Sequence, residues 1–240
     1  MPRMVSKTSL RDSVRSYGWK AVDAGLAARP DLLTYRDERE RNWLHILCGT
    51  LIGKRKPNDG IKTADVLLKR GIDLKDHAFA EGKWKSTPVW WCVAHGRNLA
   101  LAEHLLKLGA DPHYSMFAAC WNDDIEAIDL LVKYGAPADD LKAADEGPFL
   151  GAIAWSRFRA AEALLKHGAN VNARNAKAQT AFHVMLKKGS DYEHFAMLAG
   201  YGARADIPDK DGVTTAQIMA RKKDERFRKL AARLGGGKRA

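Results

Sequence analysis

The sequence predicts an all-α fold, a solenoid of about six helix-pair repeats that includes the terminal caps. Two observations predict it. A phrase of leucines, a cation and a glycine recurs along the chain, and a shorter apolar phrase precedes most of its copies. Self-similarity at a near-constant period is the signature of repeat architectures. Because one helix pair cannot bury its own apolar side, such pairs stack on one another.

The longer phrase reads Leu-Leu-x-x-Gly-Ala or a close variant, and it ends a helix. Residues before each glycine are apolar at helical spacing, as in Leu101, Leu105 and Leu108, which predicts one buried stripe. A cation in the last turn favours the carbonyl end of the helix dipole, and glycine then takes the left-handed conformation. The glycines, spaced 38, 26, 33 and 34 residues apart, are Gly71, Gly109, Gly135, Gly168 and Gly202.

The shorter phrase opens a helix. Thr or Asn can cap a helix start, and Pro is tolerated in the first turn. Each unit is therefore expected to contain a short helix, a tight turn, a longer helix and a glycine-terminated loop. The copies are Asn42–Cys48, Thr87–Val93, Gly147–Ile153, Thr180–Leu186 and Thr214–Ala220.

Together the two phrases resemble the ankyrin repeat, over residues 36–223. Asn42–His45, Thr87–Trp90 and Thr180–His183 are similar to the Thr-Pro-Leu-His phrase of that family. The unit from Tyr114 to Gly135 has lost most of its loop, and Gly53–Gly60 reads as an insertion between two helices. The resemblance also implies a structural histidine, which is replaced at Trp90, Phe117, Leu150 and Gln217, so its polar tie to the neighbouring loop is in doubt there.

Four regions follow from this pattern. We expect a flexible basic N-terminus at residues 1–12, an N-terminal capping helix region at 13–35, the repeat array at 36–234 and a flexible basic tail at 235–240. Ser13–Ala28 reads as one amphipathic helix ending before Pro30. Residues 215–234 read as the final helix pair, with a basic outer face as a polar cap should have.

The net charge of +11 is concentrated at the two ends. Residues 1–20 carry five Lys/Arg against one Asp, residues 221–240 carry nine against two acids, and the body between them is neutral. The basic ends are either a handle for acidic partners or solvated termini that aid solubility.

The sequence lacks the motifs that are typical of several classes of function. There is no phosphate-cradling glycine motif, no Gly-x-Ser-x-Gly elbow and no apolar run of the ~20 residues that a membrane span needs. His45/Cys48 and Cys92/His95 share helical spacing without a matching second pair, and the acids at 123–129 lie at a helix start. We therefore expect no catalysis, no cofactor, no metal and no membrane. Three cysteines in apolar context suit reduced thiols of a cytoplasmic protein, which we expect to be monomeric.

The ankyrin resemblance implies binding through the concave inner face, built from loop tips and the ends of the first helices. Exposed Trp beside cations is typical of interaction hot spots. Trp84, Trp121 and Trp155 are either exposed there or packed in the core, and the cations either contact a partner or are only solvated. Trp43, Trp90 and Trp91 are expected in the core. The candidate partner-binding residues are Arg39, Arg41, Trp84, His95, Trp121, Asn122, Trp155, Lys187, Lys188, Arg221 and Lys222.

Two functions are compatible with such a surface. The first is a non-enzymatic scaffold or adaptor whose protein partner offers an acidic or apolar patch. The alternative is nucleic-acid binding through the basic C-terminal end, with Trp stacking on bases. The neutral body and the absence of a nucleic-acid motif in the sequence count against the alternative.

Overall fold

A computed structural model describes residues 5–142 and 144–235 as an all-α repeat fold with one small hairpin. The described chain divides into two compact units. Unit 1 comprises residues up to 118 together with 133–136, and unit 2 comprises 119–132 and the residues from 137 onward. Helix α7 (Met116–Trp121) begins in unit 1 and ends in unit 2.

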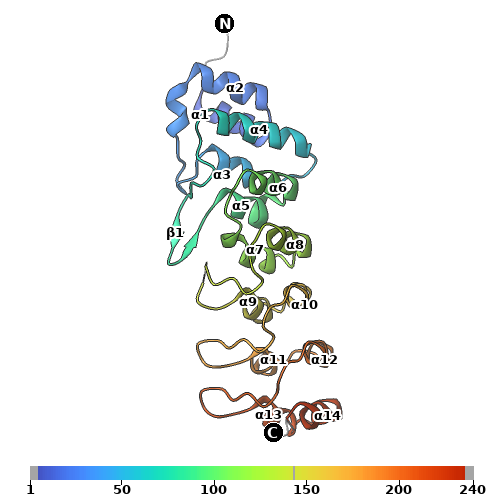
Figure 1. Cartoon of the computed structure of the whole chain (residues 1–240). Coiled ribbons are helices and arrows are strands. Elements are labelled where there is room, and N and C mark those ends of the chain that lie inside the picture. The colour runs from blue at the N-terminus through green and yellow to red at the C-terminus, as the bar shows by residue number, and fades with distance from the viewer. Residues whose placement is uncertain (1–4, 143, 236–240) are drawn as a thin grey trace. The chain divides into compact units, whose positions relative to one another are not determined.

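Unit 1 contains six further helices, three irregular turns and the hairpin, drawn in blue to green in Figure 1. Its elements are α1 (Lys7–Arg15), α2 (Trp19–Ala28), η1 (Pro30–Thr34), α3 (Trp43–Cys48), α4 (Pro57–Lys69), β1 (Ala80–Glu81), β2 (Trp84–Lys85), α5 (Pro88–Trp91), η2 (Cys92–Gly96), α6 (Leu99–Lys107) and η3 (His113–Ser115).

The N-terminal cap differs from the sequence expectation. Helix α1 starts at Lys7, inside the segment expected to be flexible, because Ser6 and Ser9 form a capping box and Leu10 is buried. The single helix expected over residues 13–28 is broken at Tyr17, which has a left-handed φ of 61°. The Tyr17 side chain is buried and its hydroxyl donates to the carbonyl of Thr50 at 3.2 Å, so tertiary packing fixes the break. Residues 1–4 lie outside the described residues.

Two loops of unit 1 also differ from expectation. The proposed insertion at 53–60 is shorter, because Pro57 opens α4 and residues 57–60 form its first turn. The loop before Thr87 folds into the antiparallel hairpin β1–β2, with Ala80 opposite Lys85 and a left-handed Gly82 at the turn. No sequence signal had indicated this hairpin.

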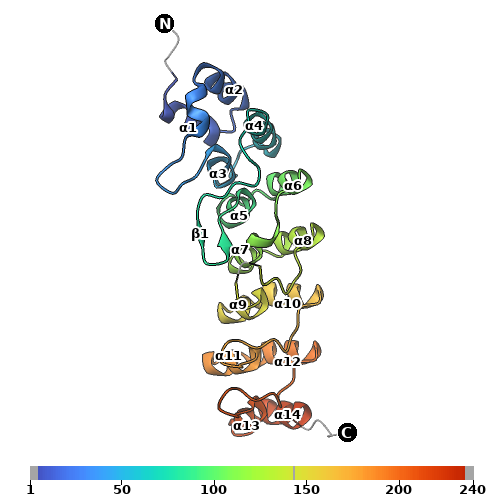
Figure 2. The same ribbon diagram turned by 60° about the vertical axis from the view of Figure 1, so that its left-hand side comes forward.

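Unit 2 repeats one motif, a short helix followed by a longer one. In both views the short helices α9, α11 and α13 follow one another in a row, and α10, α12 and α14 form a second row beside them (Figures 1 and 2). Its helices are α8 (Ile125–Lys133), α9 (Pro148–Ala154), α10 (Phe158–Lys166), α11 (Ala181–Lys188), α12 (Tyr192–Gly200), α13 (Thr215–Met219) and α14 (Glu225–Leu234).

The repeat glycines confirm the predicted helix ends. All five have φ between 85° and 97°, a region that L side chains rarely adopt, and each closes the second helix of its unit. The expected buried stripes hold, with Leu101, Leu105 and Leu164 fully buried. The expectation that Leu108 belongs to the buried stripe is wrong. Leu108 is 51% exposed, because it is the C-cap of α6 and has turned away from the stripe.

Adjacent second helices are joined by a polar ladder that the sequence reading missed. The residue just before one glycine hydrogen-bonds the acid six positions before the preceding glycine. His167 pairs with Asp129 at 2.6 Å, and the Tyr201 hydroxyl lies 3.2 Å from Glu162. In unit 1, Tyr134 and Glu103 form the same kind of pair. Arg70 of the first repeat pairs with Asp23 of α2, which no repeat glycine follows. Leu108 interrupts the ladder, and there His104, one turn earlier, takes the partner Asp65.

Among the described residues no helix is long and apolar enough to cross a membrane. The three cysteines are buried and free. Burial raises the pKa of the Cys120 thiol to about 12 and that of Cys48 well above its usual value, so neither is a ready thiolate.

Candidate functional site

The tips of three repeat loops share one local design. An Asp or Asn accepts hydrogen bonds from the backbone N–H groups two and four residues later. At the first tip Asp37 accepts from Arg39 and Arg41, both at 3.0 Å, and Glu40 between them takes a left-handed φ of 57°. Asn175 and Asp209 repeat the arrangement in unit 2. Short side chains that accept from their own backbone make such turns rigid, so each tip presents a fixed surface.

A pocket of about 410 Å³ opens in unit 1 between the first tip and the end of the α5–η2 segment. Its wall is aromatic and its rim is charged. The lining residues are Glu38, Arg39, Glu40, Phe79, Trp90, Trp91 and His95. A concave apolar pocket with a few polar groups is the usual form of a binding site.

The aromatic wall is a connected chain of rings. Phe79 meets Trp84 with ring centroids 5.2 Å apart, Trp84 meets Trp90 at 4.9 Å, and Trp90 meets His95 at 5.3 Å. All three contacts are edge-to-face, a favourable geometry for aromatic pairs. Phe79 is 40% exposed and Trp90 is half-buried. The expectation that Trp90 lies in the core is therefore wrong, whereas Trp43 and Trp91 are buried as expected.

Two arginines lie at this pocket, one behind its wall and one at its rim beside Glu38 and Glu40. The Arg41 guanidinium lies 4.8 Å from the Trp91 ring centroid and pairs with Asp37 at 2.7 Å, so it supports the wall from behind. The Arg39 guanidinium has no partner among the described residues. Partial burial lowers the pKa of His95, and Arg39 and Arg41 lower it further, which favours the neutral imidazole.

A second aromatic feature lies in unit 2, where α7 and α9 end. Trp121 is 54% exposed and packs edge-to-face on the half-buried Trp155, with ring centroids 5.1 Å apart. Arg157 holds the pair in place: its Nε donates to the Trp121 carbonyl at 2.9 Å and its guanidinium lies 5.9 Å from the Trp121 ring. The half-buried Asn122 follows Trp121 in the same turn.

The predicted cations lie at the corresponding ends of the next two short helices. Lys187 and Lys188 close α11 and are exposed, and the Lys188 ammonium donates to the carbonyl of Ala154 in the preceding repeat. Arg221 is exposed just after α13, while the Lys222 ammonium lies 5.0 Å from the Phe227 ring. The side chains of Lys187 and Arg221 have no partner among the described residues.

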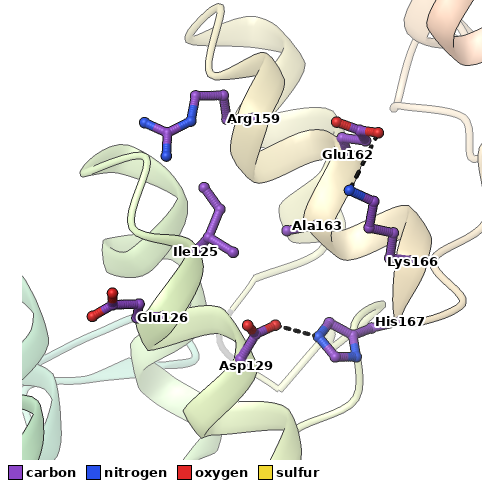
Figure 3. Close-up of a pocket in the computed structure, with 8 residues that line it drawn as sticks. All are labelled: Ile125, Glu126, Asp129, Arg159, Glu162, Ala163, Lys166 and His167. Atoms are coloured by element: carbon purple, nitrogen blue, oxygen red, sulfur yellow. Dashed lines mark hydrogen bonds and ion pairs between the residues drawn. The ribbon is translucent and has the colours of Figure 1, made fainter.

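A second hollow lies on the second helices of unit 2, between α8 and α10, and Figure 3 shows its side chains. Four of its charged or titratable side chains pair with one another. Asp129 pairs with His167 and Glu162 with Lys166, as the dashed lines mark. The acids at 123–129 have the structural roles expected of a helix start. Asp124 accepts from the Ala127 N–H, and Asp123 accepts from the Ala160 N–H of the next repeat. This hollow belongs to the inter-repeat ladder.

Within the described residues, no three His, Cys, Asp or Glu side chains are grouped as a metal site would need. His45 and Cys48 share α3, but the His45 Nδ1 lies 2.7 Å from Asn42 Oδ1 and the Cys48 thiol is buried against Cys92. In unit 2, His183 contacts the carbonyl of Val213 in the next loop at 3.1 Å, the tie that the resemblance implies for this position. The His45 Nε2, in contrast, is buried without a hydrogen-bond partner.

The helix pairs, left-handed glycines and loop tips define the ankyrin repeat fold, and solved structures agree. The crystal structure of the human ASB11 ankyrin repeat domain is similar to this chain, with a TM-score of 0.70 and 19% sequence identity. The alignment covers 96% of this chain and 99% of the ASB11 domain. The ankyrin repeat domain of Bcl-3, described as a unique member of the IkappaB protein family, is similar with a TM-score of 0.69 and 20% sequence identity. That alignment covers 93% of this chain and 97% of the Bcl-3 domain. No protein-family model and no curated sequence matches the chain.

The structure thus gathers the candidate residues into two groups. Arg39 and His95 line the unit 1 pocket, and Arg41 and Trp84 support it. Trp121, Asn122, Trp155 and the four cations lie along unit 2. Sequence reasoning missed Phe79, Trp90 and Arg157. A signal existed for Trp90, since it occupies the position of His183, whose side chain faces a loop.

Proposed function

We propose that this protein is a non-enzymatic interaction module that binds a protein partner through the faces formed by its loop tips and short-helix ends. The observation that carries the proposal is the aromatic pocket of unit 1. A wall of indole and phenyl rings beside an unpaired arginine is the composition that interaction hot spots favour. Among the pocket's lining residues there is no serine, cysteine or lysine to act as a nucleophile.

The pocket fits one large apolar side chain of the partner. Aromatic walls bury much area with little loss of side-chain entropy, because the rings are already held by one another. Arg39 at the rim can pair with an acidic group next to that side chain. The partner that this site fits therefore presents an apolar residue close to a carboxylate.

The test is a peptide-display selection against the full chain, followed by binding measurements on the selected peptides. We expect Trp90→Ala and Phe79→Ala each to weaken binding by about tenfold or more, the size of a hot-spot loss. Arg39→Glu should weaken peptides that carry an acid. Trp19→Ala, on α2 of the same unit, is the matched control and should leave affinity unchanged.

Circular dichroism and thermal unfolding establish that each variant is folded. If folded Trp90→Ala and Phe79→Ala variants both bind the selected peptides like the parent protein, the pocket is not the binding site. The nucleic-acid alternative is tested separately, by filter binding of single- and double-stranded DNA at low and moderate salt.

A further inference from the structure

The short-helix ends of unit 2 form a directional strip, defined here as Trp121, Trp155, Lys187, Lys188, Arg221 and Lys222. The strip is aromatic at its first two repeats and cationic at the next two. Three of its helices follow one another, because α9 contacts α11 and α11 contacts α13 (Figure 2). The strip residues lie at or next to the end of the short helix in each repeat.

The cations of this strip are not neutralised by the turns between the helices. Asp224 accepts from the Arg226 backbone and pairs with its guanidinium, and Asp123 accepts from the Ala160 N–H. Asp191 is exposed and is the one acid of these turns without a side-chain partner in the described chain. The side chains of Lys187 and Arg221 are also unpaired in the described chain. Two unpaired positive charges therefore face one unpaired negative charge, and the strip is electropositive.

The aromatic end is held in a fixed orientation. The Trp121 carbonyl accepts from Arg157, the two indoles pack edge-to-face, and Lys188 is anchored on the carbonyl of Ala154. An exposed aromatic group that is already ordered binds with a smaller entropic cost than a mobile one. Trp121, with over half of its surface exposed, is the available anchor.

We infer that this strip binds an extended, acidic segment of a protein partner, with an apolar residue on the Trp121–Trp155 pair and acidic residues on the two cationic repeats. Packed helices lie ~8–10 Å apart and an extended chain rises ~3.3 Å per residue. Successive repeats therefore match side chains about three residues apart. The spacing expected in the partner is an apolar residue, then an acid about three residues later and another about three residues after that. This inference rests on the proposed role in protein binding and names the partner's chemistry at a second surface.

A fluorescein-labelled synthetic peptide provides the test, measured by fluorescence anisotropy with the full chain. The probe carries a leucine followed by glutamates at that spacing, separated by glycine and serine. Its control has glutamine in place of glutamate. We expect the glutamate peptide to bind about tenfold more tightly than the glutamine peptide, and its affinity to fall as salt is added. Equal binding of the two peptides overturns the inference.

Variants locate the binding. Lys187→Glu combined with Arg221→Glu should weaken the glutamate peptide about tenfold or more, and Trp121→Ala should weaken both peptides. Lys166→Glu combined with Lys229→Glu makes the same change of net charge on the second helices and should have less than about a twofold effect. If the two charge-reversal pairs act alike, the strip is not the site.

Two further measurements separate this inference from its competitors. Trp90→Ala, which disrupts the unit 1 pocket, should leave binding of the glutamate peptide unchanged. If Trp90→Ala binds the display-selected peptides like the parent protein while the strip variants still weaken the glutamate peptide, the pocket is contradicted and the strip stands. If Trp90→Ala weakens the selected peptides while the strip variants leave the glutamate peptide unaffected, only the strip is contradicted. A single-stranded oligonucleotide of equal charge that binds more tightly than the peptide and displaces it would replace the protein segment with nucleic acid as the occupant.

Discussion

At the residue scale, one position links the repeat pattern to the pocket of unit 1. Trp90 occupies the position of His45 and His183 in their repeats. A histidine there makes a short polar contact within its repeat or with the next loop, as His183 does with Val213. An indole is larger and more apolar; Trp84 of the hairpin packs on it, and Phe79 packs on Trp84. The loss of the polar tie in this repeat therefore coincides with the gain of an apolar binding surface.

His45 makes the stability of the protein depend on pH. Burial lowers its pKa in the folded state to about 4, against about 6.5 when unfolded. The unfolded chain therefore binds more protons between these values, and stability that is complete above pH 6.5 is lost as the pH falls toward 4. We expect a loss of about 3 kcal/mol from this group at pH 4.

Urea unfolding at pH 7 and at pH 4, followed by circular dichroism, measures this loss. His45→Gln should reduce the difference between the two pH values by about 2–3 kcal/mol, because glutamine does not titrate. His77→Gln, at an exposed position, is the matched control. An unchanged difference in the His45 variant would show that His45 is not the buried titrating group.

At the element scale, helix ends and loop tips carry the repeat design. The second helix of each unit ends at a left-handed glycine, and the tips depend on one Asp or Asn that organises two backbone N–H groups. Both devices use local hydrogen bonds and dihedral preferences, which need no distant partner. The hairpin β1–β2 replaces the tip in one repeat, and there the aromatic pocket forms.

Gly168→Ala tests the helix-end device. Its φ of 89° is strained for alanine although there is open space for a Cβ, so we expect a loss of about 1–2 kcal/mol in unfolding free energy. Gly200→Ala is the matched control, because Gly200 is helical and equally uncrowded, and it should be neutral or stabilising by up to ~1 kcal/mol. Equal effects of the two substitutions in chemical denaturation would contradict this explanation.

At the scale of the whole molecule, stability is built from neighbouring repeats. In unit 2, α10 contacts α12 and α12 contacts α14, so each pair packs on the next and α14 covers the last one. Phe227 of α14 packs on Phe195 and Tyr192 of the preceding pair, with ring centroids 5.0 and 5.4 Å apart. Nearest-neighbour contacts of this kind predict that damage to one repeat stays close to it.

Phe227→Ala should show this locality. We expect a loss of about 3 kcal/mol, together with faster hydrogen exchange of backbone amides in α12, α13 and α14. Amides of α3 and α5 should keep their protection. Hydrogen-exchange mass spectrometry of the parent and variant measures both, and a uniform increase along the chain would contradict the nearest-neighbour description.

The sequence alone determined the repeat class, the helix pairs and the glycines that end them, because these depend on periodicity, capping and backbone dihedrals within a few residues. It also placed Trp121, Trp155 and Lys188 at or next to the ends of short helices, where the structure has them. Only the tertiary structure decided which tryptophans meet, why Trp90 leaves the core, where the hairpin forms and how the ladder joins successive helices. The Trp121–Trp155 pair and the Asp129–His167 rung join residues some thirty to forty positions apart, while the hairpin and the Trp84–Trp90 contact join residues only a few positions apart. Such contacts are set by packing geometry and side-chain orientation, which a local pattern does not encode.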